Sequence, residues 1–120
     1  MMKYLLGTLL LLATSAVSAA GNSVVWNGGI TIDERESAPT DGTRLEFFVA
    51  AGNYLADIAV SITDESGREI VNTTTDGPWL ILSLNPGRYQ VIARRRNGDT
   101  QSLVIDVAEG NQRFGFAFPN

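Results

Sequence analysis

Three consecutive arginines, Arg94, Arg95 and Arg96, form the densest charge cluster in this chain of 120 residues. A guanidinium group presents its N–H donors as a planar fork, which suits it to binding carboxylates and other anions. On a strand, Arg94 and Arg96 point to one side, whereas Arg95 points to the other side and towards the end of the inner layer. Arg94 and Arg96 are therefore candidate anion-binding residues, with a solvated hairpin end as the alternative.

Three aromatic residues are candidates for binding sugars. Trp26 precedes a pair of glycines, Tyr54 falls in an expected loop, and Trp79 follows an expected turn. If these side chains are exposed at one end of the fold, their rings could stack on sugar rings. For Trp79, the alternative is that it caps the hydrophobic core.

Most of the residue types that catalysis requires are missing. The chain has no Cys and no His, and its one Lys is Lys3. Nucleophile systems based on Ser-His or Cys-His are thereby excluded, and zinc or copper would lack its preferred ligands. Asp64 and Glu65 are adjacent acids, but they fall in an expected turn, where solvation argues against the raised pKa of a general acid. We expect no catalytic residues, no metal site and no cofactor.

The first 20 residues have the pattern of an export signal. Lys3 supplies positive charge, residues 4–16 are mainly apolar, and small residues then fit cleavage after Ala19 or Ala20. The apolar run is shorter than the roughly 20 residues that a transmembrane helix needs, which disfavours the alternative of a membrane anchor. Lipid attachment would require a Cys after the run, and the chain has none. We therefore expect a periplasmic or secreted protein with no lipid and no transmembrane anchor.

The charge balance restricts the class of partner. The chain carries nine basic and 13 acidic residues, for a net charge of −4 at pH 7. An acidic surface repels phosphate backbones, so we expect no nucleic-acid partner. Because an exported chain without Cys forms no disulfides, its hydrophobic core must be sufficient for folding.

Apolar and polar residues alternate with a period of two after the leader, as in half-buried strands. Leu45, Phe47 and Val49 show this pattern clearly, and clusters of Asn, Asp, Pro and Gly separate one run from the next. Seven strands with short connections predict an all-β, two-sheet sandwich over residues 43–120. The strands are expected at residues 44–49, 58–63, 69–75, 79–84, 88–96, 100–107 and 112–118.

Residues 21–42 are less regular than the rest. Ile30 and Ile32 predict a short edge strand, and the acidic residues 33–36 with Pro39 predict a solvated loop in which one helical turn would fit.

The apolar pattern also constrains the hairpin between the expected strands 88–96 and 100–107. A three-residue loop, 97–99, matches the apolar faces of the flanking strands, whereas a two-residue loop mixes core and solvent positions. The longer loop requires Gly98 at positive φ. It also pairs Ile92 with Val104 on the outer face, where an exposed apolar pair would suit a protein partner.

Four motifs follow one another between residues 53 and 118: ADIAVSI (56–62), DESG (64–67), TDGPW (75–79) and LNPGRY (84–89). The series resembles the carboxypeptidase regulatory-like family, whose members are prealbumin-like (transthyretin-like) sandwiches of seven strands. Asn85 departs from the family, which commonly has an apolar residue or Pro there. The resemblance implies a Greek-key, antiparallel β-sandwich, with Tyr89 returning to the core and Trp79 capping it.

The segment that begins at Gly28-Gly29-Ile30 extends the resemblance to small exported bacterial proteins of this family with no assigned activity. It implies a noncatalytic binding or accessory role, although a scaffold does not by itself fix a function. We therefore expect a binding module of the cell envelope whose partner is an envelope protein. Edge strands and the arginines at 94 and 96 are its candidate contacts. A carbohydrate-binding module that uses the three aromatic residues is the alternative.

Overall fold

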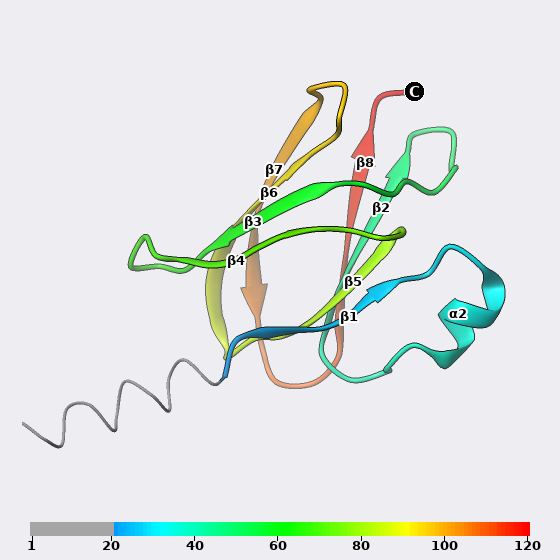
Figure 1. The fold of residues 1–120 in the computed structure, drawn as a ribbon. Helices are drawn as coiled ribbons and strands as arrows, with labels where there is room; N and C mark the ends of the chain where they lie inside the picture. Colours follow the sequence, from blue (N-terminus) through cyan, green and yellow to red (C-terminus); the bar gives the residue numbers. More distant parts are fainter. Residues whose placement is uncertain (1–20) are drawn as a thin grey trace, which may run out of the picture.

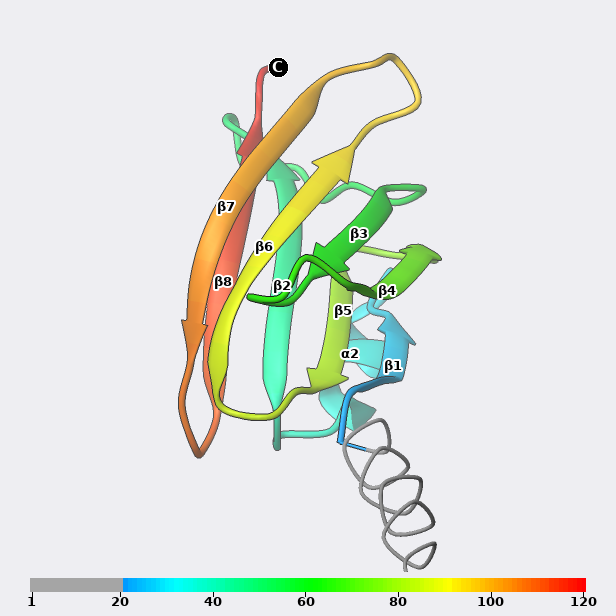
Figure 2. The ribbon, with the colours of Figure 1, turned by 90° about the vertical axis from the view of Figure 1, so that its left-hand side faces the viewer.

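The computed structural model of the chain describes residues 21–120. These residues form eight strands and one short helix, and the strands make two four-stranded sheets that face each other (Figures 1 and 2). The predicted all-β sandwich is confirmed. The predicted leader, residues 1–20, lies outside the described residues. Within residues 21–120, no helix has the length and apolar character needed to cross a bilayer.

Each sheet combines strands from distant parts of the chain. The first sheet has the order β1 (Ser23–Gly28), β5 (Trp79–Ser83), β2 (Thr43–Val49) and β8 (Gln112–Phe118). The second sheet has the order β4 (Glu69–Thr74), β3 (Ala59–Thr63), β6 (Gly87–Arg94) and β7 (Thr100–Val107). All seven segments predicted to be strands are strands, and β1 precedes them.

One pair of neighbours, β2 and β8, is parallel, so the expectation of a wholly antiparallel sandwich is wrong at this pair. Their register joins Thr43 to Gln112 and Val49 to Phe118. Antiparallel neighbours can be joined by a tight turn, whereas parallel neighbours need a long connection. The strands β3 to β7 supply that connection, and four of these five strands lie in the second sheet.

The N-terminal segment differs from the expectation at Ile30 and Ile32. The edge strand is β1, whereas Ile30 and Ile32 lie outside it and are 62% and 64% exposed. Ile32 begins the helix α2 (Ile32–Ser37), and the Oγ1 of Thr31 accepts a hydrogen bond from the backbone N–H of Glu34 at 3.1 Å. Such a cap satisfies an N–H group that the first helical turn leaves free. The helix lies on the outer side of the first sheet, away from the second sheet (Figure 2).

The β6–β7 hairpin has a three-residue loop with Gly98 at a φ of 98°, as predicted, but the loop comprises residues 96–98. The N–H of Arg95 donates to the carbonyl of Asp99 at 2.8 Å, and the N–H of Gly98 donates to the carbonyl of Arg95 at 3.0 Å. A type I turn followed by a left-handed residue needs its glycine at the third loop position, which moves the loop one residue earlier.

This displacement changes the strand register. Ile92 lies opposite Ser102, and Val104 lies opposite Gln90. The predicted Ile92–Val104 pair on the outer face is therefore wrong. The side of each strand that faces the core is unchanged, because moving the loop by one residue shifts the pairing by two.

The core fills the space between the two sheets. Leu45 and Phe47 of β2 are fully buried, and the Phe47 ring stacks on Phe116 of β8 with centroids 5.2 Å apart. Removing one such side chain from water contributes about 1.5–3 kcal/mol to folding. Phe114, Phe116 and Phe118 line the core together, as their alternation with small residues predicts.

Tyr89 closes one end of the core. It is 5% exposed, and its hydroxyl donates to the carbonyl of Asn85 at 2.7 Å. A tyrosine that returns to the backbone just upstream ties a strand to the loop before it. Burial, together with the charges of Asp64 and Glu65, raises the pKa of Tyr89.

Thr75 provides a test of the polar contacts inside the sandwich. The side chain is fully buried, and its Oγ1 accepts a hydrogen bond from the N–H of Ile58 at 3.0 Å. The substitution Thr75→Val keeps the shape but leaves that buried N–H without its partner, which should lower the free energy of unfolding by about 1–3 kcal/mol. Urea denaturation measures the change, and Thr75→Ser, which loses the methyl group but keeps the oxygen, serves as the control that retains the acceptor for the Ile58 N–H. A Val variant as stable as the wild type would contradict this role of Thr75.

The turn after β3 makes stability depend on pH. Hydrogen bonds from the Ser66 hydroxyl and from the backbone N–H groups of Arg68 and Ser66 lower the pKa of Asp64 from 3.8 to about 2. The folded state therefore binds this proton more weakly than the unfolded state, and the charge stabilises the fold fully above pH 3.8. That contribution is lost as the pH falls towards 2.

We expect Asp64→Asn to reduce the free energy of unfolding at pH 5 more than at pH 2, because at pH 2 the wild-type carboxyl is about half protonated and most of its stabilising contribution is lost. Urea titrations at both pH values measure the difference. Ser66→Ala removes the strongest contact to the carboxylate and should reduce the pH dependence. A difference between the wild type and Asp64→Asn that is equal at both pH values would exclude this linkage.

Candidate binding site

The predicted arginine cluster lies where the β6–β7 hairpin approaches the start of β3 and the end of β4. Arg94 ends β6 and is in register with Ala59 of β3, which is in turn in register with Thr74 of β4. The strand order therefore gathers these positions at one corner of the sheet. The side chains line a surface cavity of about 420 Å³, formed by Asp57, Ala59, Thr74, Arg94, Arg95 and Arg96.

The three arginines have different surroundings. The Nη1 of Arg95 donates to the carbonyl of Pro119 at 3.2 Å and lies 3.6 Å from Asp99 Oδ2, so this side chain turns towards the end of the inner layer, as predicted. Arg94 and Arg96 are exposed. Among residues 21–120, none forms a hydrogen bond or ion pair with the guanidinium group of either. Two of the three cations are therefore available to an incoming anion.

Asp57 adds a strained residue to the same cavity. Its φ of 59° is the one positive value among the described residues other than glycine. The N–H of Asp57 donates to the carbonyl of Thr75 at 2.9 Å, and this contact holds the conformation in place. A left-handed conformation costs a non-glycine residue about 1–2 kcal/mol, and such strain is often found at functional sites. Asp57 is also the one acidic residue in the cavity lining, so the cavity is positively charged overall.

The predicted aromatic residues lie elsewhere, on the outer face of the first sheet. Trp26 is opposite Ile81, and Trp79 is opposite Gly28, so the two indoles project on the same side of β1 and β5. The guanidinium carbon of Arg44 lies 3.9 Å from the centre of the Trp79 ring, in a cation–π contact. That contact covers one face of the Trp79 indole.

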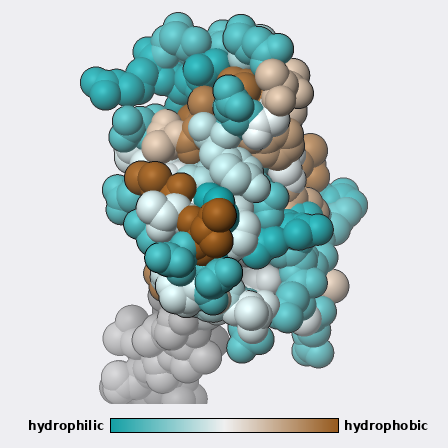
Figure 3. Space-filling view, turned by 90° about the vertical axis from the view of Figure 1, so that its right-hand side faces the viewer, coloured by the Kyte–Doolittle hydropathy of each residue, from teal (hydrophilic) through white to brown (hydrophobic). Residues whose placement is uncertain are grey.

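Tyr54 is the most accessible of the three aromatic residues. It is 51% exposed, and the guanidinium carbon of Arg35 lies 4.9 Å from the centre of its ring, whereas Trp26 and Trp79 are partly buried. Figure 3 shows the side of the molecule that carries α2, where apolar residues form small patches separated by hydrophilic ones. The structure thus brings Arg94 and Arg96 together in one cavity and places the aromatic residues apart from it.

The sequence did not indicate that Asp57 and Thr74 belong to the lining of the arginine cavity. Asp57 belongs to a motif that predicts a strand, and no local signal indicates its left-handed conformation, although Asp tolerates that region better than most residues. Thr74 comes within reach of Arg94 because β3 lies between β4 and β6. That order is a property of the whole fold.

Neither a metal site nor a match to a known protein was found for the described residues or the sequence. Among the described residues, no three acidic side chains are grouped so that they could hold a metal ion. No model of a protein family matches the chain, and no curated protein matches it.

Two substitutions of Asp57 test the strain of its backbone, because they change the charge equally but differ in the conformation that they tolerate. Both Asp57→Gly and Asp57→Ala remove the carboxylate, but only glycine adopts a φ of 59° without strain. We expect the Gly variant to exceed the Ala variant in free energy of unfolding by about 1 kcal/mol, because alanine is penalised at positive φ. Thermal or urea denaturation measures the difference. Equal stability of the two variants would show that Asp57 is not strained.

Proposed function

We propose that the chain is an exported, noncatalytic binding module of the cell envelope and that it contacts an envelope protein through the Arg94–Arg96 cavity. The observation that carries the proposal is the pair of exposed guanidinium groups that no described residue neutralises, in a cavity of about 420 Å³. An acidic side chain of a partner fits this chemistry, because carboxylates pair with guanidinium groups through two parallel hydrogen bonds.

The charge of the rest of the chain supports this choice of ligand. The chain has a net charge of −4, so a positively charged cavity differs in sign from the protein as a whole. Such a contrast orients an approaching acidic group towards the cavity and disfavours binding elsewhere. The export pattern of residues 1–20 supports an envelope or extracellular location for the encounter.

The proposal includes a prealbumin-like fold of the carboxypeptidase regulatory-like family, with the strands β2 to β8 as the seven family strands. Two features support it. The neighbours β2 and β5, and likewise β3 and β6, are not consecutive in the chain, as Greek-key connections between two sheets require. Tyr89 of the LNPGRY motif packs in the core, where the family resemblance expects it.

Carbohydrate binding by Trp26, Tyr54 and Trp79 is the alternative proposal. The shared direction of the two indoles and the exposure of Tyr54 support it. The Arg44 contact on Trp79 weighs against it, because stacking on a sugar needs an open ring face. The arginine cavity therefore has the stronger claim.

Charge reversal tests the proposal. The variant Arg94→Glu/Arg96→Glu should capture the envelope partner with a yield at least about tenfold below wild type, because losing a close charge pair costs a factor of ten or more. The control, Arg68→Glu/Arg88→Glu, makes the same change in net charge at two exposed arginines of surface ion pairs, which contribute little to stability. A photo-crosslinking residue at the exposed position 97 and quantitative mass spectrometry provide the measurement.

A protein captured by the wild type and the control but lost in the cavity variant would support the proposal. Equal capture by both variants, or no capture by the wild type, would contradict it. A saturable change in Trp fluorescence with envelope glycans, combined with unchanged capture, would favour the carbohydrate alternative.

A further inference from the structure

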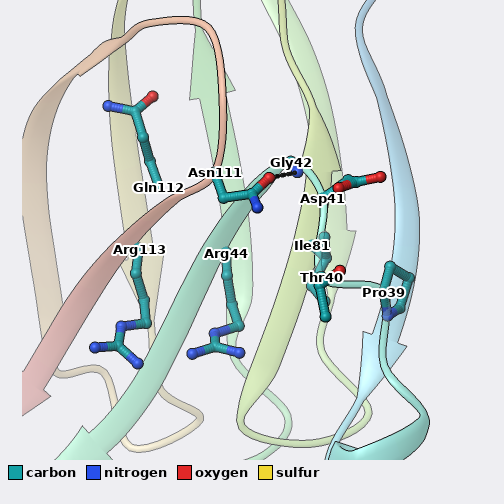
Figure 4. A pocket seen from close by; sticks show the side chains of 9 residues that line it. All are labelled: Pro39, Thr40, Asp41, Gly42, Arg44, Ile81, Asn111, Gln112 and Arg113. Atoms are coloured by element: carbon teal, nitrogen blue, oxygen red, sulfur yellow. Dashed lines mark hydrogen bonds between the residues drawn. The ribbon is translucent and has the colours of Figure 1, made fainter.

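A second cavity, of about 400 Å³, lies on the outer face of the first sheet where β2 and β8 begin (Figure 4). Residues 39–42 border it on one side and residues 111–113 on the other, with Arg44 and Ile81 between them. Its size falls within the range of small-molecule sites, about 300–1,000 Å³. It belongs to the other sheet from the Arg94–Arg96 cavity and shares no residue with it.

Two like charges meet in this second cavity. Arg44 and Arg113 are register partners on the parallel strands β2 and β8, and their guanidinium groups lie side by side (Figure 4). Like charges on neighbouring strands repel each other. Glu46 forms ion pairs with both arginines: its Oε2 lies 2.8 Å from Arg44 Nε and 3.9 Å from Arg113 Nε. One carboxylate between two guanidinium groups leaves a local excess of one positive charge.

Asp41 does not remove this excess. It borders the cavity, but its carboxylate points away from both guanidinium groups in Figure 4. Within the described part of the chain, the only ion pairs of Arg44 and Arg113 are those with Glu46. A bound monovalent anion would neutralise the excess positive charge of Arg44 and Arg113.

The orientation of the Arg44 side chain is already fixed in the absence of a ligand. Its guanidinium group rests on the Trp79 ring, 3.9 Å from the ring centre, and its side chain is 24% exposed. No described residue accepts a hydrogen bond from either of its terminal nitrogens. A side chain already fixed in a binding orientation loses little freedom when a ligand arrives, so more of the contact energy appears as affinity.

The remaining walls combine a polar and an apolar side. The Oδ1 of Asn111 accepts a hydrogen bond from the N–H of Gly42 at 3.1 Å, which orients the amide and leaves its Nδ2 as a donor. Pro39, which is exposed, supplies apolar surface, and Ile81 borders the cavity but is almost fully buried. The Gln112 amide contacts the backbone of β7 and the turn after it: its Nε2 donates to the carbonyl of Asp106, and its Oε1 accepts from the N–H of Ala108.

We propose that this cavity binds a single carboxylate attached to a small apolar body, with Arg44 and Arg113 as its hydrogen-bond donors. A planar carboxylate matches guanidinium forks in shape, and its single charge equals the excess of the cluster formed by Arg44, Glu46 and Arg113. A free short-chain acid and the C-terminus of a peptide offer the same chemistry.

Side-chain NMR tests the site on the purified protein. Butyrate should shift the Nε–H signals of Arg44 and Arg113 saturably, and also the indole N–H of Trp79, because Arg44 rests on that ring. Arg113→Gln keeps the packing, since that side chain is 67% exposed, and should weaken binding by at least about tenfold. Arg88→Gln, at a surface arginine of the second sheet, is the control and should bind butyrate like the wild type.

Other anions and two peptides complete the experiment. Chloride and sulfate at matched ionic strength should give weaker or unsaturable shifts, since they lack the planar group. Binding of a Val-terminated dipeptide that is lost on C-terminal amidation identifies a chain terminus as the source of the carboxylate. Butyrate binding without peptide binding identifies a free acid. Equal response to sulfate, shifts that never saturate, or unchanged affinity in Arg113→Gln would overturn the proposal.

Discussion

The parallel pairing of β2 with β8 is the contact on which both faces of the first sheet depend. On the inner face it stacks Phe47 against Phe116 within the core. On the outer face it sets Arg44 beside Arg113, with Glu46 between them. Because side chains alternate between the two faces of a strand, a single register creates an apolar contact on one side and a cation pair on the other. The aromatic contact of the core and the cation pair of the outer face thus depend on the same backbone hydrogen bonds.

The two cavities use arginine in physically different ways. Arg94 and Arg96 stand at an exposed hairpin end, where their side chains keep much of their freedom and ordering them on binding has an entropic cost. Arg44 has already lost that freedom through its contact with Trp79. A mobile pair of cations suits a broad protein surface that supplies many other contacts. A fixed cation suits a small ligand, whose few atoms cannot offset a large ordering cost.

Local patterns in the sequence were sufficient to predict seven of the eight strands, but neither β1 nor the order of the strands in the sheets. The alternation around Leu45 and Phe47 predicts which residues enter the core, because burial and a period of two are physically linked. Ile30 and Ile32 show the same spacing but stay exposed, since a Thr31 cap turns the chain into a helix there. The Arg94–Arg96 cluster is visible as a motif. The Arg44–Arg113 pair is not, because 69 positions separate the two residues and only the sheet order brings them together.

The position of β8 also has a consequence for the order of folding. A chain made from its N-terminus releases β2 early, whereas β8, which covers the other edge of β2, is made after the six strands β2 to β7. Until then, the edge of β2 is open and Phe47 lacks its stacking partner, so the nascent first sheet is a template for pairing with other chains. Contacts between such distant segments close slowly, because a long loop must first be ordered. We therefore expect the first sheet to be completed only after β8 has been made, and a chain that ends before residue 112 to expose the edge of β2.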